Sequence, residues 1–127
     1  MCTTTPSAEF TLPMDVLAPA LARRLLLETV CVEHAAHVLE VSQLLTSELV
    51  TNAMRYGAPP VTVHIDCDES VGLQVRVSDT SSTEPVPRDA DRDAEGGRGL
   101  TLVDVISTAW GVERTDGGKT IWFQIAR

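Results

Sequence analysis

The chain has 127 residues, of which 43% are hydrophobic, and its 18 acidic and 10 basic side chains give a formal net charge of −8. This length and composition predict one globular domain over residues 1–127, because the chain is short for two cores and too apolar for disorder. The negative charge would repel phosphate backbones and anionic lipid, and no apolar run approaches the ~18 residues that span a membrane. We therefore expect neither a nucleic-acid nor a membrane partner.

The compartment is suggested by the N-terminus and the cysteines. Residues 1–7 lack the basic start and the apolar core of a secretory signal, and the three cysteines are odd in number and far apart in the chain. Both features favour a reducing compartment. We expect a cytoplasmic protein with free thiols.

The first half of the chain predicts a tail, a short strand and two helices. Residues 1–8 are expected to form a flexible tail, and Glu9–Leu12 to form a strand. Apolar residues then recur at helical spacing over Met14–Val30, where Asp15 is a candidate N-cap, and over Glu40–Tyr56, which Gly57 would end. The apolar stripes expected on these helices are Val16, Leu17, Leu21, Leu25, Leu26 and Val30 on the first, and Leu44, Leu45, Leu49 and Ala53 on the second.

The second half of the chain predicts two hairpins around a long loop and a short helix. Strands are expected over 61–66 and 73–78, joined across 68–72. A loop over 80–98 and a helix over 100–106 follow. The last two strands are expected over 109–114 and 120–125, joined at 116–118. The loop is much longer than the ~4 to 6 residues of most connections, which indicates a function. The order of elements predicts an α+β, two-layer sandwich: a mostly antiparallel sheet with helices on one face.

Glu48 and Asn52 are the first candidate functional residues. They are four residues apart on the second predicted helix, so their side chains project from one face. An amide oxygen is a suitable ligand for Mg²⁺, and a nearby carboxylate can orient or deprotonate a hydroxyl. By spacing alone, a solvated helix face is the favoured interpretation, because Glu and Asn four residues apart are common on helices.

Asp79 and a glycine-rich segment are the next candidates. Asp79 ends a predicted strand next to the long loop, where its carboxylate could accept a hydrogen bond from an exocyclic amino group or could begin a turn. The segment Gly96–Leu100 opens the short helix; its glycines could let backbone N–H groups approach a polyphosphate, with Arg98 adding charge, or could form a hinge.

Cys31, His34 and His37 carry metal-binding side chains at intervals of three residues. On one helix the outer two would lie ~120° apart around the axis and would not converge on an ion. A fourth ligand is not evident from the sequence, so we interpret them as residues of a linker or helix end.

Taken in order, four motifs resemble the GHKL ATPase family, and most closely its branch of anti-sigma-factor serine kinases. The motifs are Glu48-Leu-Val-Thr-Asn52-Ala-Met-Arg-Tyr-Gly57, Val77-Ser-Asp79, Gly97-Arg-Gly-Leu100 and Gly118-Lys-Thr120-Ile-Trp-Phe123. The resemblance implies a Bergerat-type fold that binds ATP and Mg²⁺, with residues 80–98 as the ATP lid.

The resemblance also implies roles for individual residues. Asn52 matches the Mg²⁺-coordinating asparagine, Glu48 the proposed general base, and Asp79 the aspartate that reads the adenine amino group. Gly97, Arg98, Gly99 and Leu100 match the phosphate-side motif. Thr120 matches the last-strand threonine beside the adenine-binding aspartate.

The sequence departs from the family pattern in two motifs. The usual Asp-x-Gly-x-Gly reads Asp79-Thr-Ser-Ser-Thr83, without either glycine that usually brings the backbone close to the nucleotide. Tyr56 stands where a histidine often precedes the glycine.

The resemblance implies a protein serine kinase that binds a sigma factor and phosphorylates an anti-sigma-factor antagonist, and Glu48 favours this reading. A nucleotide-binding module that binds a partner without turnover is the alternative, favoured by the missing glycines. A plain α+β scaffold is a third reading. Members of the branch usually dimerise, so a homodimer is compatible with the resemblance.

Overall fold

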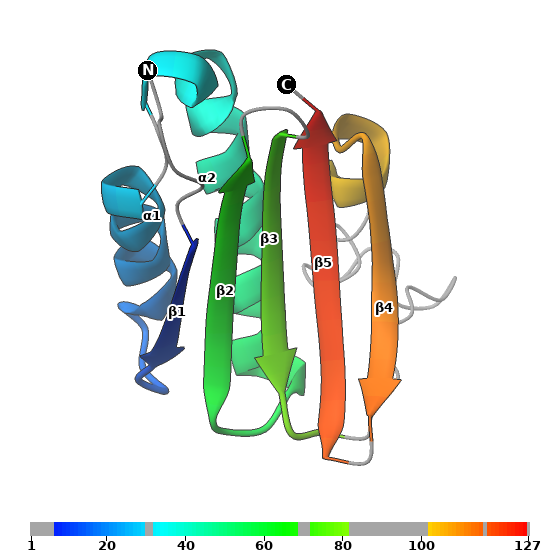
Figure 1. Cartoon of the computed structure of the whole chain (residues 1–127). Helices are drawn as coiled ribbons and strands as arrows, with labels where there is room; N and C mark the ends of the chain where they lie inside the picture. The colour runs from blue at the N-terminus through cyan, green and yellow to red at the C-terminus, as the bar shows by residue number, and fades with distance from the viewer. Residues whose placement is uncertain (1–6, 30–31, 69–71, 82–101, 116, 127) are drawn as a thin grey trace.

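One five-stranded antiparallel sheet with helices on one face forms the fold (Figure 1). The computed structural model describes residues 7–29, 32–68, 72–81, 102–115 and 117–126. Its elements are β1 (Ser7–Leu12), α1 (Ala18–Thr29), α2 (Val32–Tyr56), β2 (Val61–Asp68), β3 (Gly72–Asp79), β4 (Ala109–Thr115) and β5 (Gly118–Ala126). The strand order is β1-β2-β3-β5-β4. The α+β sandwich expected from the sequence is confirmed.

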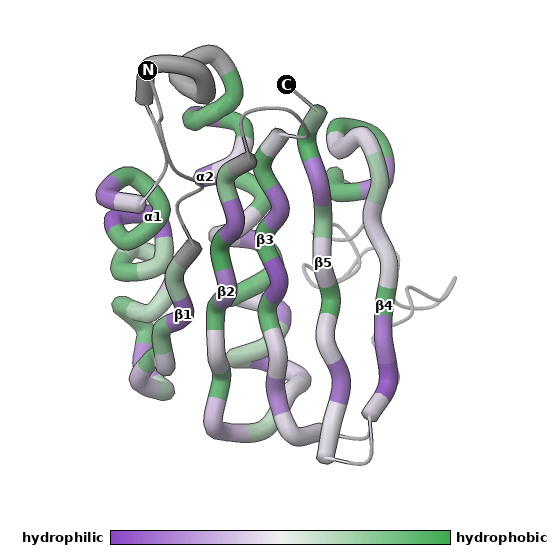
Figure 2. The backbone as a smooth tube through the Cα atoms, in the orientation of Figure 1, coloured by the Kyte–Doolittle hydropathy of each residue, from purple (hydrophilic) through white to green (hydrophobic). Residues whose placement is uncertain are grey.

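The core lies between the sheet and the helices. Apolar side chains occupy alternate positions of the central strands, as the alternating colours along β2 and β3 in Figure 2 show, and the alternate set is buried. Its members on the central strands are Val61, Val63, Ile65, Cys67, Leu73, Val75, Val77, Ile121, Phe123 and Ile125. Because side chains alternate between the faces of a strand, only one face of the sheet is apolar enough to hold the helices.

α1 begins at Ala18, later than the sequence predicts, because Asp15 folds the residues before it into a turn. The Asp15 carboxylate accepts a hydrogen bond from the backbone N–H of Leu17 at 2.7 Å, and its carbonyl accepts one from Ala18 at 3.1 Å. Val16 and Leu17, expected on the apolar stripe, are 93% and 67% exposed. Their assignment to the buried face is therefore wrong.

α2 begins at Val32, eight residues before the predicted start, so His34 and His37 belong to this helix. Cys31 lies outside the described residues. The 32–39 segment includes two alanines and a leucine, which favour a helix although they form no strong apolar stripe.

The predicted buried stripe of α2 is confirmed at Leu45, Leu49 and Ala53, but Leu44 is 43% exposed. The helix ends at Tyr56, next to Gly57, as expected. None of the helices in the described ranges is long and apolar enough to cross a membrane.

The strands differ from the expectation mainly at their ends. β1 begins at Ser7, which pairs with Asp66, so residues 7 and 8 belong to the sheet rather than to a tail. Both predicted hairpins are confirmed, with β2 antiparallel to β3 and β4 antiparallel to β5. Residues 102–106 are helical, whereas most of the predicted lid over 80–98 lies outside the described residues.

Candidate functional site

Four elements meet at one end of the sheet, where α2 leads into β2, β3 ends and β5 begins (Figure 1). Hydrogen bonds hold them together: the backbone N–H of Thr80 donates to the carbonyl of Ala58 at 3.0 Å, and the Thr80 hydroxyl donates to the carbonyl of Pro59 at 2.7 Å. Because these bonds join the residues after β3 to those after α2, the end of each element is fixed relative to the other.

Asp79 is a buried charged residue at this end. It continues the core-facing positions of β3 beyond Val75 and Val77, and its side chain is 3% exposed. Its Oδ1 accepts hydrogen bonds from the backbone N–H groups of Ser81 at 2.7 Å and Ala58 at 3.4 Å. A buried carboxylate needs such partners, because desolvation of an unpaired charge is costly.

Lys119, which is not among the site residues predicted from the sequence, completes the pairing of Asp79. The two residues face each other across β3 and β5, and Nζ of Lys119 lies 3.1 Å from Oδ1 of Asp79. Lys119 is also 3% exposed. Its position two residues before Ile121 and four before Phe123 places it on the core face, and this spacing was the signal that could have found it.

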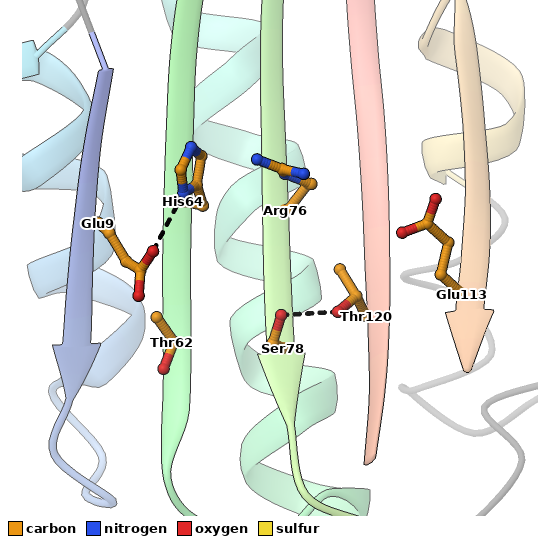
Figure 3. A pocket seen from close by; sticks show the side chains of 7 residues that line it. All are labelled: Glu9, Thr62, His64, Arg76, Ser78, Glu113 and Thr120. Carbon is orange, nitrogen blue, oxygen red and sulfur yellow. Dashed lines mark hydrogen bonds and ion pairs between the residues drawn. The ribbon is translucent and has the colours of Figure 1, made fainter. Parts of the chain in front are cut away.

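Thr120 lies on the opposite face of the sheet from Asp79. It pairs with Ser78, and the two hydroxyl oxygens are 2.7 Å apart (Figure 3). The expectation that Thr120 lies beside the Asp79 carboxylate is therefore wrong, since Lys119 occupies that place. The physical reason is the two-residue side-chain period of a strand, which turns neighbouring residues to opposite faces.

Thr120 instead lines a hollow of about 410 Å³ on the face without helices (Figure 3). The other lining residues are Glu9, Thr62, His64, Arg76, Ser78 and Glu113. Within the hollow, Nδ1 of His64 lies 3.3 Å from a carboxylate oxygen of Glu9. The sheet separates this polar surface from the Asp79 end of the core.

Asn52 and Glu48 lie on α2, one helical turn apart, as the sequence predicts. Asn52 is 6% exposed and Glu48 is half-buried. Within the described ranges, the Asn52 carboxamide forms no hydrogen bond to another residue. Among the described residues, the hydroxyl of Thr46 is the one fully buried side-chain N or O atom without a hydrogen-bond partner, so the Asn52 amide keeps some contact with solvent. The amide is therefore within reach of a ligand, and its oxygen suits Mg²⁺. These residues fit the metal that the resemblance implies.

The remaining predicted residues, Gly97, Arg98, Gly99 and Leu100, lie outside the described residues. In the described part of the chain, His, Cys, Asp and Glu residues form no group of three that could hold a metal ion.

The fold and the site together define an α+β domain with a buried carboxylate at one end of an antiparallel sheet, near a carboxamide that has no hydrogen-bond partner among the described residues. Residues 15–125 match the family model of the histidine kinase-like ATPase domain. The chain belongs to this family, which is of the GHKL type, and membership implies that it binds ATP. A search of curated proteins found no match.

Proposed function

We propose that this chain is a Mg·ATP-binding regulatory protein that acts as a protein serine kinase of the anti-sigma-factor kind. It would bind a sigma factor and transfer the γ-phosphoryl group of ATP to a serine of an anti-sigma-factor antagonist. The observation that carries the proposal is the placement of Glu48 one turn before the buried Asn52 on α2. A carboxylate at that position serves chemistry, whereas nucleotide binding alone does not need it.

The protein would hold the nucleotide at its adenine base and at its phosphates. Asp79 would accept a hydrogen bond from the adenine amino group, and Asn52 would hold Mg²⁺ through its amide oxygen. When bound, the metal neutralises charge on the phosphates. Phosphoryl transfer asks a protein chiefly for such positioning and charge neutralisation.

Glu48 would orient the serine that accepts the phosphoryl group. The seryl oxygen forms a bond to the γ-phosphorus, the bond from that phosphorus to the bridging oxygen breaks, and ADP leaves. The serine proton passes to the Glu48 carboxylate, which acts as general base. The half-buried position of Glu48 leaves it accessible to a hydroxyl of a partner protein.

The regulatory role is supported by the motif set, which resembles that of the anti-sigma branch. The net charge of −8 disfavours nucleic acid as the partner and is compatible with a protein partner. We further propose a cytoplasmic location. We also propose a homodimer, because members of the anti-sigma branch usually dimerise.

A second function is favoured by two observations. The segment Asp79–Thr83 lacks the two glycines of the family pattern, and Lys119 already occupies Oδ1 of Asp79. The missing glycines and the Lys119 contact both change the part of the site where adenine would bind. In this alternative, ATP occupancy sets the affinity for a regulatory partner without phosphoryl transfer.

A kinase assay on co-purifying proteins separates the two functions. The chain would be isolated with its partners from its native cell and incubated with Mg²⁺ and ATP labelled in the γ-phosphate. The kinase proposal expects label on a serine of a partner with wild-type chain and not with Glu48→Gln. If wild type binds ATP and its partners but transfers no label, the binding-module function replaces the kinase.

A further inference from the structure

We propose that Lys119 is a base-reading residue that donates a hydrogen bond to N1 of adenine while Asp79 accepts one from the N6 amino group. The inference rests on the ATP binding in the proposed function and adds a specificity-determining residue to that site. It does not depend on whether the chain transfers phosphate.

The first observation is that the Lys119 ammonium is buried with one partner. Its side chain is 3% exposed, and Nζ lies 3.1 Å from Oδ1 of Asp79. A lysine ammonium carries three N–H donors. Among the described residues, Asp79 supplies the only acceptor for them. Unpaired buried donors are costly, so the two remaining N–H groups call for an acceptor on a ligand.

The second observation is how the donors divide between the two oxygens of Asp79. Lys119, Ser81 and Ala58 all donate to Oδ1. Within the described part of the chain, Oδ2 accepts no hydrogen bond. Oδ2 faces Gly57. A Cβ atom on residue 57 would lie only 2.6 Å from Oδ2, and glycine, which has no side chain, avoids this clash. Oδ2 is therefore the acceptor that remains for a ligand.

Asp79 and Lys119 thus present one acceptor, Oδ2, next to one group of donors, the ammonium. Both side chains are 3% exposed. The Watson–Crick edge of adenine carries the complementary pattern, since the N6 amino group donates and the neighbouring N1 accepts. A carboxylate alone reads only the amino group. With Lys119 beside it, the site reads two adjacent atoms of the base, which is a stricter requirement.

An atom-specific ATP analogue tests the contact on the unmodified protein. In 1-deaza-ATP a C–H group replaces N1, whereas in 7-deaza-ATP the change lies on the other edge of the base. Calorimetric titration with Mg²⁺ should show that 1-deaza-ATP binds about 10- to 100-fold more weakly than ATP, the range for a hydrogen bond to a charged group. The 7-deaza analogue should bind like ATP. Equal affinities for ATP and 1-deaza-ATP would overturn the proposal.

Two variants connect the discrimination to Lys119. In Lys119→Met the ratio of the ATP and 1-deaza-ATP affinities should fall to near one, whereas Lys119→Arg, which keeps a buried donor, should retain discrimination. If the methionine variant does not fold, loss of discrimination in the arginine variant overturns the proposal. Arg24→Met is the charge-matched control, because this exposed residue pairs with Glu28 on α1. It should keep the wild-type ratio.

The outcomes also separate this inference from the proposed function. ATP binding without label transfer would overturn the kinase and leave the role of Lys119 intact. ATP binding without discrimination against 1-deaza-ATP would overturn the role of Lys119 and leave the kinase intact. Absence of ATP binding in the wild type would overturn both. A folded Lys119→Met variant with the wild-type ratio would show that Lys119 only neutralises Asp79.

Discussion

Gly57 packs directly against the carboxylate of Asp79. A Cβ atom built on Gly57 would lie 2.6 Å from Cγ and Oδ2 of Asp79 and 2.7 Å from the carbonyl oxygen of Ala53. The next residue, Ala58, donates its backbone N–H to Oδ1 of the same carboxylate. The absence of a side chain at residue 57 thus lets the end of α2 approach the end of β3.

Gly57→Ala should therefore weaken both the fold and the site. The methyl group must displace the Asp79 carboxylate or the end of α2, a clash that typically costs about 1–3 kcal/mol. Urea unfolding should report that loss, and ATP titration should report weaker binding of the folded fraction. Wild-type stability together with wild-type affinity would contradict the close packing.

Adjacent glycines in the β4–β5 turn offer a matched pair of substitutions. Gly118 has φ +153°, and a Cβ atom there would lie 2.0 Å from the carbonyl oxygen of Asp79, whereas a Cβ atom on Gly117 would meet nothing within 4 Å. Gly118→Ala should cost at least ~2 kcal/mol, because the strain of the backbone adds to the clash. Gly117→Ala should cost less than about 1 kcal/mol. Thermal unfolding of both variants compares them, and equal losses would be inconsistent with this turn.

Asn52→Ala should separate binding from stability. Because the carboxamide has no hydrogen-bond partner among the described residues, its removal should change the free energy of unfolding by less than about 2 kcal/mol. Affinity for ATP in the presence of Mg²⁺ should fall at least ~10-fold, about the free energy of one hydrogen bond or ligand contact to a charged group. Calorimetry with Mg²⁺ and with EDTA measures the difference. If the variant binds Mg·ATP as wild type does, Asn52 is not the metal ligand.

Glu48→Gln should leave ATP affinity close to that of wild type and lower phosphoryl transfer by about 10²- to 10⁴-fold, the usual contribution of general-base catalysis. The glutamine keeps the shape of the side chain but cannot take the serine proton. Glu40→Gln is the matched control, because Glu40 is an exposed residue of the same helix. A Glu48→Gln variant that transfers label at the wild-type rate would remove Glu48 from the mechanism.

The Asp79 and Lys119 pair predicts strong coupling in a double-mutant cycle. Removal of either charge leaves the other buried and unpaired, which costs about 3–5 kcal/mol, so Asp79→Asn and Lys119→Met should each destabilise the chain. The double variant should lose much less than the sum of the two, because no charge is left unpaired. Chemical denaturation of the three variants measures the coupling, and additive losses would argue against the ion pair.

The architecture could be predicted from the sequence wherever the local pattern was strong. The period-two segments became β2 and β3, and Asp116-Gly117-Gly118 marked the turn of the second hairpin. The helix starts were less predictable. The sequence predicts Asp15 as the cap of the first helix, but its hydrogen bond to Leu17 forms a turn that ends before the helix begins. That choice depends on backbone geometry, which residue types alone do not specify.

By itself, the sequence predicted the α+β architecture from its local periodicity, and the resemblance of its motifs to the GHKL family implied ATP binding. The roles that the resemblance implies for Glu48, Asn52 and Asp79 stay predictions. Only the tertiary structure decided which residue of β5 faces Asp79. The register between β3 and β5 pairs Asp79 with Lys119, and the alternation of side chains turns Thr120 to the other face. A contact between strands that are far apart in the chain depends on that register, which neither strand encodes alone.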